Sequence, residues 1–449
     1  MTGVSIVVPT LGRPSLGALL RALGPLPDGM ELLIVDDRPD RRTPLDLPPD
    51  TPARVVAGRS AGPAAARNIG WQAARHEWIA FLDDDVIPEP GWPARLVDDL
   101  RDADAEQKRV GGVQGRLWVP LPAGRRLTDW ERVTAGLADG EWITADMAYR
   151  RAALARVGGF DERLPRAFRE DAELAHRVRR AGWELRSGAR STAHPVRPEQ
   201  RWISVRTQRG NADDALLRRL YGRSWRTVLG IPPGRRHRHA AITACLAAAV
   251  VCTGAATGLT AASRSRSRRS WFGTAASERP GAVRALSVAA TLAAAGWAAG
   301  TTEFAAARIA PGPRDRREVT TMLLTSVAIP PVAIAHWLRG WFRWRGAQPL
   351  TGTPAGLTRV TPASGLAVPV GRAPRHAEPT GHTGADDHVE SAGRAGVNGH
   401  SEAAGTADDA GQNDDRAAAG GPAMPARRAD EAAGDAGERR TGARTGAHR

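Results

Sequence analysis

The sequence predicts an α/β domain at the N-terminus, followed by membrane-spanning helices and a disordered tail. Over residues 1–115, short apolar runs suited to buried strands alternate with helical patterns. Between residues 239 and 345, three apolar stretches approach the length of a membrane span. From residue 346 to 449 there is no phenylalanine, tryptophan or tyrosine. Such a segment cannot bury enough apolar surface to order itself.

The first 115 residues predict a sheet with several parallel strands. Ligands of such sheets collect at the carboxyl ends of the strands, and polar residues follow these ends here. Strands are expected at 4–8, 31–35, 54–57 and 78–82, and helices at 15–23 and 64–74. The residues at the strand ends are Pro9 with the polar Thr10, Asp36 with Asp37, and the run from Asp83 to Asp85.

Three consecutive carboxylates, Asp83, Asp84 and Asp85, follow the apolar strand at 78–82. Adjacent acids raise one another's proton affinity, so a cation among them would stabilise the group. Carboxylate oxygens suit magnesium or manganese, and such ions are commonly shared with the phosphates of a nucleotide. The triplet therefore predicts a divalent metal site, with a solvated acidic turn as the alternative.

Residues 116–205 have a less regular pattern. A strand is expected at 113–119 and a helix at 151–157, which Gly158 and Gly159 can end. A second helix is expected from Glu170 to about residue 181. Glu170 and Asp171 fall at its N-terminal end, where the helix dipole favours carboxylates.

Residues 206–238 are basic and amphipathic. Leu217, Leu220 and Trp225 have helical spacing with arginines between them, as in a helix that lies on a membrane surface. A helix packed on the α/β domain is the alternative. The candidate spans that follow are 240–262, 285–302 and 319–338, the last interrupted by two prolines. Two or three spans are compatible with the sequence, and because arginines flank several of their ends, the topology stays open.

The formal net charge is +15, and arginine supplies nearly all of the positive charge because Lys108 is the only lysine. No nucleic-acid motif is present and the arginines lie beside apolar segments, so a membrane surface is the expected partner and nucleic acid is not. Cys245 and Cys252 share one apolar stretch and predict neither a disulfide nor a zinc site. No basic region precedes the first apolar run, so no secretory signal is expected.

Six motifs, in this order and spacing, resemble glycosyltransferase family 2 and its GT-A fold, a Rossmann-like mixed sheet flanked by helices. The resemblance covers about the first 200 residues. The motifs are Val4-Ser5-Ile6-Val7-Val8-Pro9-Thr10, Ile34-Val35-Asp36-Asp37, Gly62-Pro63-Ala64-Ala65-Ala66-Arg67-Asn68-Ile69-Gly70, Phe81-Leu82-Asp83-Asp84-Asp85, Gly158-Gly159-Phe160-Asp161-Glu162 and Glu170-Asp171.

The resemblance implies a division of labour within the domain. Residues 1–115 would bind a nucleotide-sugar, and residues 116–205 would bind the acceptor and supply the catalytic base. Asp171 would be that base, with Glu170 beside it. Asp83 and Asp85 would bind the metal, with His194 as a third ligand. Asp171 as an acid without chemistry, and His194 as an ordinary loop or packed histidine, are the alternatives.

The remaining implied contacts are with the donor. Arg67 suits a diphosphate because its guanidinium donates to two oxygens at once. A surface arginine is the alternative for Arg67, a capping or turn aspartate for Asp36 and Asp37, and a structural turn for Asp146. The nucleotide-sugar would lie against Pro9, Thr10, Arg13, Asp36, Asp37, Arg67, Asp83, Asp84 and Asp146.

Two departures from the family pattern stand out. Arg38 and Pro39 follow Asp36 and Asp37 where many members have glycine and serine, so the base-binding loop is expected to differ. Residues 200–202 run Gln-Arg-Trp without the two-residue spacing of processive synthases, which indicates transfer of one or a few sugars.

The sequence thus predicts a multi-pass membrane enzyme with a cytoplasmic catalytic domain. It would transfer a sugar, with inversion and with a divalent metal, from a nucleoside-diphosphate-sugar to a lipid-linked or envelope glycan. A nucleotidyltransferase and a catalytically inactive scaffold subunit are the alternatives.

Overall fold

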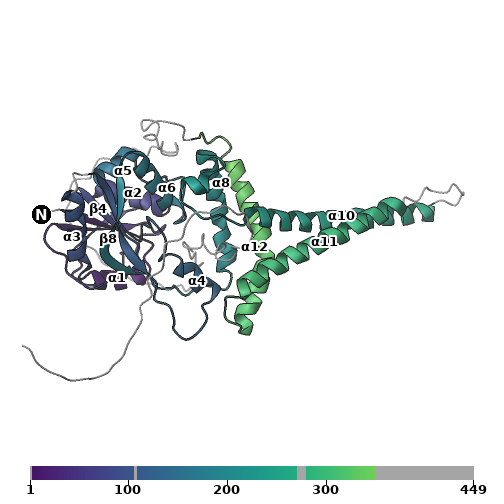
Figure 1. Ribbon diagram of the computed structural model, residues 1–449, viewed down its shortest axis with the longest axis horizontal. Coiled ribbons are helices and arrows are strands. Elements are labelled where there is room, and N and C mark those ends of the chain that lie inside the picture. The colour runs from purple at the N-terminus through teal and green to yellow at the C-terminus, as the bar shows by residue number, and fades with distance from the viewer. Residues whose placement is uncertain (1–2, 106–108, 270–279, 350–449) are drawn as a thin grey trace, which may run out of the picture. The chain divides into compact units, whose positions relative to one another are not determined.

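The computed structural model describes residues 3–105, 109–269 and 280–349 of the 449-residue chain. The predicted disordered tail lies outside the described residues from position 350 onward. Figure 1 shows a sheet with flanking helices, followed by long helices toward the C-terminal end of this part of the chain. The predicted fold class is confirmed: a mixed GT-A-like sheet flanked by helices, with three long apolar helices after it.

Eight strands form one mixed sheet in the order β3-β2-β1-β4-β7-β6-β8-β5. The first four strands of this order are parallel to one another, whereas β7 pairs antiparallel to β4 and to β6. The strands are β1 Val4–Thr10, β2 Met30–Asp36, β3 Ala53–Ala57, β4 Trp78–Leu82, β5 Ile87–Pro88, β6 Val110–Trp118, β7 Asp146–Arg150 and β8 Glu184–Ala193.

Helices cover both faces of this sheet. Those of the α/β domain are α1 Ser15–Leu23, α2 Pro63–Ala73, α3 Trp92–Ala105, α4 Asp129–Ala135, α5 Arg151–Val157 and α6 Glu170–Arg180. Those that follow are α7 Ile203–Arg206, the 3-10 helix η1 Thr207–Gly210, α8 Asn211–Tyr221, α9 Trp225–Val228, α10 Arg236–Arg269, α11 Pro280–Ile309 and α12 Arg316–Arg343.

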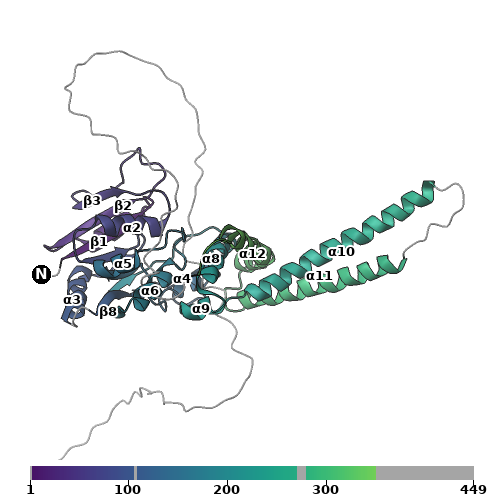
Figure 2. The ribbon, with the colours of Figure 1, turned by 90° about the horizontal axis from the view of Figure 1, so that it is seen from above.

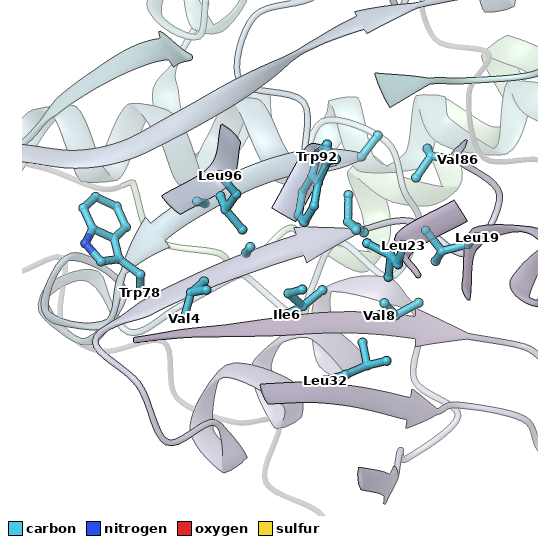
Figure 3. Packing of buried hydrophobic residues seen from close by; sticks show 14 of the residues in the cluster. Val4, Ile6, Val8, Leu19, Leu23, Leu32, Trp78, Val86, Trp92 and Leu96 are labelled. Carbon is cyan, nitrogen blue, oxygen red and sulfur yellow. The ribbon is translucent and has the colours of Figure 1, made fainter. Parts of the chain in front are cut away.

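The core has two layers, one on each face of the sheet. Alternate residues of a strand point to opposite faces, so Val4, Ile6 and Val8 of β1 pack with α1 and α3, while Val7 packs with α2, α5 and α6. Figure 3 shows the first layer, where Trp92 of α3 lies over the sheet. Apolar layers cover both faces of β1 and β4. Polar side chains that could meet a ligand are therefore found at the ends of these strands.

The helices α10, α11 and α12 are each long and apolar enough to cross a membrane, by length and composition. Helices α10 and α11 pack against one another, and they run together in both ribbon views (Figures 1 and 2). Small residues permit this close approach: a Cβ atom added at Gly300 would lie 2.7 Å from a side-chain carbon of Ile242.

The amphipathic segment at 206–238 packs on the protein. Leu217, Leu220 and Trp225 belong to a buried cluster with Leu164 of the catalytic domain and Leu216. Their side chains are therefore covered by protein, which favours the alternative of a packed helix over a helix that lies on a membrane surface. The alternative, a helix packed on the catalytic domain, describes α8. Periodicity alone does not distinguish the two, because both bury one face of a helix.

Candidate active site

The polar residues that follow β1 and β4 meet because these strands are neighbours in register. Val7 lies opposite Phe81, which places Thr10 beside Asp84. The Thr10 hydroxyl donates to Asp84 Oδ2 at 2.6 Å, and Arg13 Nη1 donates to Asp84 Oδ1 at 2.8 Å. Burial raises the pKa of Asp84, and the neighbouring Asp85 adds to this, whereas Arg13 opposes it. Asp84 thus ties the first strand to the acidic triplet.

Arg67 of α2 bridges two acids from distant parts of the chain. Its Nη1 donates to Glu170 Oε1 and its Nη2 to Asp83 Oδ1, each at 2.7 Å. The guanidinium is buried, while the Asp83 side chain is 25% exposed. Burial alone would raise the pKa of Asp83, but Arg67 outweighs it and holds the pKa below its usual value. The two predicted acidic motifs therefore belong to one cluster.

Glu170 and Asp171, the first two residues of α6, add more negative charge than Arg67 neutralises. Burial, together with Asp171, raises the pKa of Glu170 to about 8. Glu170 Oε2 is buried without a hydrogen-bond partner among the described residues. Burial also raises the pKa of Asp171, opposed by the backbone N–H of Ala172, which donates to Asp171 Oδ1 at 2.7 Å. At neutral pH this cluster has a high affinity for a proton.

The loop before α6 is joined to α2 by Asn68. Its amide group donates to the carbonyl of Phe160 and accepts from the Phe160 N–H, both at 2.9 Å. Gly159 has a φ of +72°, and a Cβ atom there would lie 2.4 Å from Asn68 Oδ1. Glycine is required at this position, which explains why the Gly-Gly-Phe and Arg-Asn motifs occur together.

Of the three predicted metal ligands, Asp85 and His194 lie close together, whereas Asp83 is paired elsewhere. Strand β5 pairs with the end of β8, which brings His194 Nε2 to 3.9 Å from Asp85 Oδ1. Two ligands each about 2.1 Å from one ion lie at most about 4.2 Å apart, so one magnesium or manganese ion can reach both atoms. Asp83 instead contacts Arg67. Within the described residues, no three His, Cys, Asp or Glu side chains are already placed as a ligand set.

Asp36 and Asp37 are both buried at the end of β2 and hold loops. Arg38 donates to both oxygens of Asp36, at 2.9 Å and 2.8 Å. The backbone N–H groups of Ser60 and Gly62 donate to Asp37 at 2.6 Å and 3.0 Å, just before α2 begins. These contacts give both acids a loop-organising role, whereas their predicted contact with a nucleotide base stays a prediction.

Asp146 is part of the framework of the sheet. Its carboxylate is fully buried and accepts from Trp92 Nε1 at 2.7 Å, Arg190 Nε at 2.7 Å and Thr192 Oγ1 at 2.6 Å. With three donors and no exposed surface, this geometry favours the structural alternative over contact with a donor sugar. Pro9 lies within β1, opposite Val35 of β2.

Two arginines at the site were not anticipated from the sequence. Arg197 Nε lies 3.1 Å from Asp85 Oδ2, and its side chain is 18% exposed. Arg190 joins Asp146 to Asp99 from β8. Arginine is common throughout this sequence, so no local pattern separates these two from the exposed arginines around them. Only the pairing of β8 with β6 and β5 brings them to the acids.

Part of the chain is similar to known proteins. Residues 5–120 match the sequence model of the family described as "Glycosyl transferase family 2". The pre-mycofactocin glycosyltransferase of Mycobacterium tuberculosis is 33% identical over 155 residues, 32% of this chain and 33% of that protein. The succinoglycan biosynthesis protein ExoM of Rhizobium meliloti is 26% identical over 220 residues, 45% of this chain and 71% of that protein.

Among solved structures, the chain is similar to S. aureus TarS 1-349 in complex with UDP, with a TM-score of 0.33 and 19% identity over 51% of this chain and 70% of that one. The chain spans about a third of the length of the first relatives that it matches. Residues 5–120 therefore match glycosyltransferase family 2, the family that the motifs in this part of the chain resemble.

Proposed function

We propose that this protein is an inverting, metal-dependent glycosyltransferase that moves a sugar from a nucleoside-diphosphate-sugar to a lipid-linked or cell-envelope glycan acceptor. One observation carries the proposal. In a domain that matches glycosyltransferase family 2, Arg67 joins the acidic triplet at the end of β4 to the acids at the start of α6. If the triplet binds the donor and Asp171 is the base, Arg67 would hold both at one edge of the sheet.

Asp171 is the base in this proposal. The acceptor oxygen forms a bond to the anomeric carbon, the bond from that carbon to the diphosphate oxygen breaks, and Asp171 takes the hydroxyl proton. Direct displacement inverts the anomeric centre. Burial raises the pKa of Asp171 above its ordinary value, which gives the carboxylate a stronger affinity for that proton. The Ala172 N–H fixes one of its oxygens.

Other side chains hold the donor. Arg13 and Arg197 each contact an acid of the triplet and supply positive charge where a diphosphate would lie. Asp83, Asp85 and His194 would hold a magnesium or manganese ion, which as a Lewis acid stabilises the charge that develops on the leaving diphosphate. Asp83 would turn from Arg67 to join that set.

The membrane acceptor is inferred from the helices after the domain. The described part of the chain contains three helices apolar enough to span a membrane. A catalytic domain held at a bilayer meets lipid-linked acceptors at high local concentration. The positive charge of the chain agrees with a cytoplasmic leaflet rich in anionic lipid.

The test is a transfer assay with the full chain in lipid nanodiscs. A panel of radiolabelled nucleotide-sugars is offered with polyprenyl-phosphate acceptors, in Mg²⁺, in Mn²⁺ and in chelator. Metal-dependent label in the lipid fraction with inverted stereochemistry supports the proposal. Tight nucleotide-sugar binding without transfer or hydrolysis for any donor would instead favour the inactive scaffold.

A further inference from the structure

Helix α12 has the length of a membrane span, but one of its faces lies against protein along nearly the whole helix. Its buried positions run from Thr321 to Gly340. At 1.5 Å per residue they cover about 28 Å, close to the roughly 30 Å thickness of a bilayer's hydrocarbon core. In α11, by contrast, no part of the apolar window is buried.

The elements that lie against α12 are α8, η1 and α7, together with the long helices α10 and α11. Helices α8 and α12 lie side by side in both ribbon views (Figures 1 and 2). At one end, a Cβ atom on Gly340 would lie 2.3 Å from the carbonyl oxygen of Ala212, so the two backbones touch. Nearby, the guanidinium carbon of Arg219 lies 3.5 Å from the centre of the Trp341 ring.

The other end of α12 is fixed to the catalytic domain. Arg308, at the end of α11, donates to Asp129 of α4 at 2.7 Å and to Thr325 of α12 at 2.8 Å. It also donates to Ser204 of α7 at 3.1 Å. Glu318 accepts from the backbone N–H of Asp129 at 2.8 Å. Helix α12 is therefore held along its length by parts of the chain that follow or belong to the α/β domain.

Of these elements, α8, η1 and α7 are too charged for the interior of a bilayer. A charged side chain at the centre of a membrane costs at least about 2.5–3.5 kcal/mol. If α12 crossed the membrane, the elements packed along it would cross with it and bring several such charges. The charged residues of α7, η1 and α8 are Arg206, Arg209, Asp213, Asp214, Arg218 and Arg219.

The opposite face of α12 is apolar and exposed. Leu323, Leu324, Val327, Leu338 and Phe342 are between 43% and 63% exposed and recur at helical spacing. Stacked tryptophans at 337 and 341 and arginines at 339, 343 and 345 gather at its C-terminal end. Apolar residues on one face, with tryptophan and arginine at the margin, are typical of a helix lying in a membrane interface.

We infer that α12 lies in the plane of the membrane, with its exposed apolar face in the boundary between headgroups and acyl chains of an anionic bilayer. Only α10 and α11 span, as a hairpin. Helix α12 also packs on both of these helices. The chain after α12 therefore leaves the membrane on the side of the catalytic domain. Three spans would place it on the other side.

A labelling experiment tests the topology without reference to enzyme activity. In full-length protein with Cys245→Ser and Cys252→Ser, single cysteines are introduced at exposed sites: Asp102→Cys in α3, Arg264→Cys near the end of α10, and Gln348→Cys after α12. Oriented vesicles are treated with a membrane-impermeant maleimide. We expect the cysteines at 102 and 348 to label together and the one at 264 to label from the opposite side.

Labelling of the cysteine at 348 together with the one at 264 would overturn the inference, and so would labelling of all three from one side. Inactivity of the enzyme leaves this result unaffected, so failure of the proposed function and failure of this inference are distinguishable.

A depth measurement tests the in-plane orientation. Spin labels are placed at Val327→Cys, near the middle of α12, and at Phe342→Cys, near its end, with Leu292→Cys in α11 as a deep reference, in the same cysteine-free protein. Relaxation by oxygen and by a water-soluble nickel complex reports each depth. We expect equal, shallow depths at 327 and 342. A deep label at 327 like that at 292, with a shallow one at 342, would show that α12 spans.

Discussion

Two buried arginines in the catalytic domain each join a pair of acids. Arg67 joins Asp83 to Glu170, and Arg190 joins Asp99 to Asp146. The distances are nearly the same, between 2.7 Å and 2.9 Å. What differs is the state of the carboxylate oxygens. The group around Arg67 keeps a Glu170 oxygen without a hydrogen-bond partner in the part of the chain that the structure describes, and a quarter-exposed Asp83, whereas Asp146 is enclosed by three donors.

The comparison indicates that the presence of an acid alone does not mark a reactive site. What separates a reactive site from a purely structural one is whether hydrogen-bond donors already fill all the acceptor positions of the carboxylate oxygens. A carboxylate whose acceptor positions are all filled has no means of holding a substrate or taking a proton without first breaking its contacts. We therefore expect mutations around Arg67 to change chemistry and those around Arg190 to change stability.

The largest effect is expected for Asp171→Asn, next to the Arg67 bridge. Loss of a general base costs roughly 10²–10⁴-fold in rate, and the amide retains the shape of the side chain. Transfer should fall by that factor while nucleotide binding, measured by calorimetry, stays within about twofold. Asp102→Asn, on the exposed face of α3, is the matched control. Transfer at the unmutated rate would remove Asp171 from the role of base.

Arg190→Met should act on stability. Removing one partner of a buried ion pair costs about 3–5 kcal/mol, because the remaining charges stay buried. In this variant Asp99 and Asp146 would both remain buried without the guanidinium that now pairs with them. The free energy of unfolding of the catalytic domain should fall by this amount in denaturant titrations. Arg186→Met, whose ion pair is exposed on the same strand, should change it by less than about 1 kcal/mol. If both variants lost the same free energy of unfolding, Arg190 would have no special structural role.

Asp85→Ala sharpens the metal assignment. Asp85 is the acid of the triplet that lies near His194, so its removal should weaken Mg²⁺- or Mn²⁺-dependent nucleotide binding by at least about tenfold. Binding in chelator should change little. The measurement is calorimetric titration with and without metal. A loss of the same size in chelator would indicate that Asp85 acts only through Arg197.

The pH dependence of the free energy of unfolding tests the protonation of Glu170 directly. The pKa of Glu170 is raised to about 8 in the folded protein, while the unfolded chain releases this proton near pH 4.5. Between these values the native state binds more protons, so this contribution to stability is complete below about pH 4.5 and is lost as the pH rises through 8. Glu170→Gln should flatten the pH dependence of unfolding between pH 5 and 8. Parallel curves for the two proteins would contradict the assignment.

The smallest effect is expected from deleting residues 350–449. Both arginine bridges are built by residues between 67 and 190, and the deleted sequence has no aromatic residue. Transfer and the unfolding midpoint should be nearly unchanged. Loss of folding in the shortened protein would show that the tail contributes to the domain.

Strand ends and short motifs were readable from the sequence because they depend on local physics. Apolar runs at 4–8 and 78–82 form the strands that were predicted, and the helix at 151–157 has the predicted bounds. The acids at 83–85 and at 170 and 171 were expected at the ends of elements, and they lie there. Their convergence on Arg67 was not foreseen, because that contact joins residues 103 positions apart.

By itself, the sequence determined the order of strands and helices up to residue 82, the family resemblance and the presence of long apolar helices. Periodicity, turn residues and motif spacing act over neighbouring positions, so they can be read along the chain. Only the tertiary structure decided that Asp146 is enclosed, that Arg67 gathers two acids and that α8 and α12 pack face to face. These outcomes depend on which oxygens and which apolar faces find partners, and the partners come from distant residues that local pattern does not reveal.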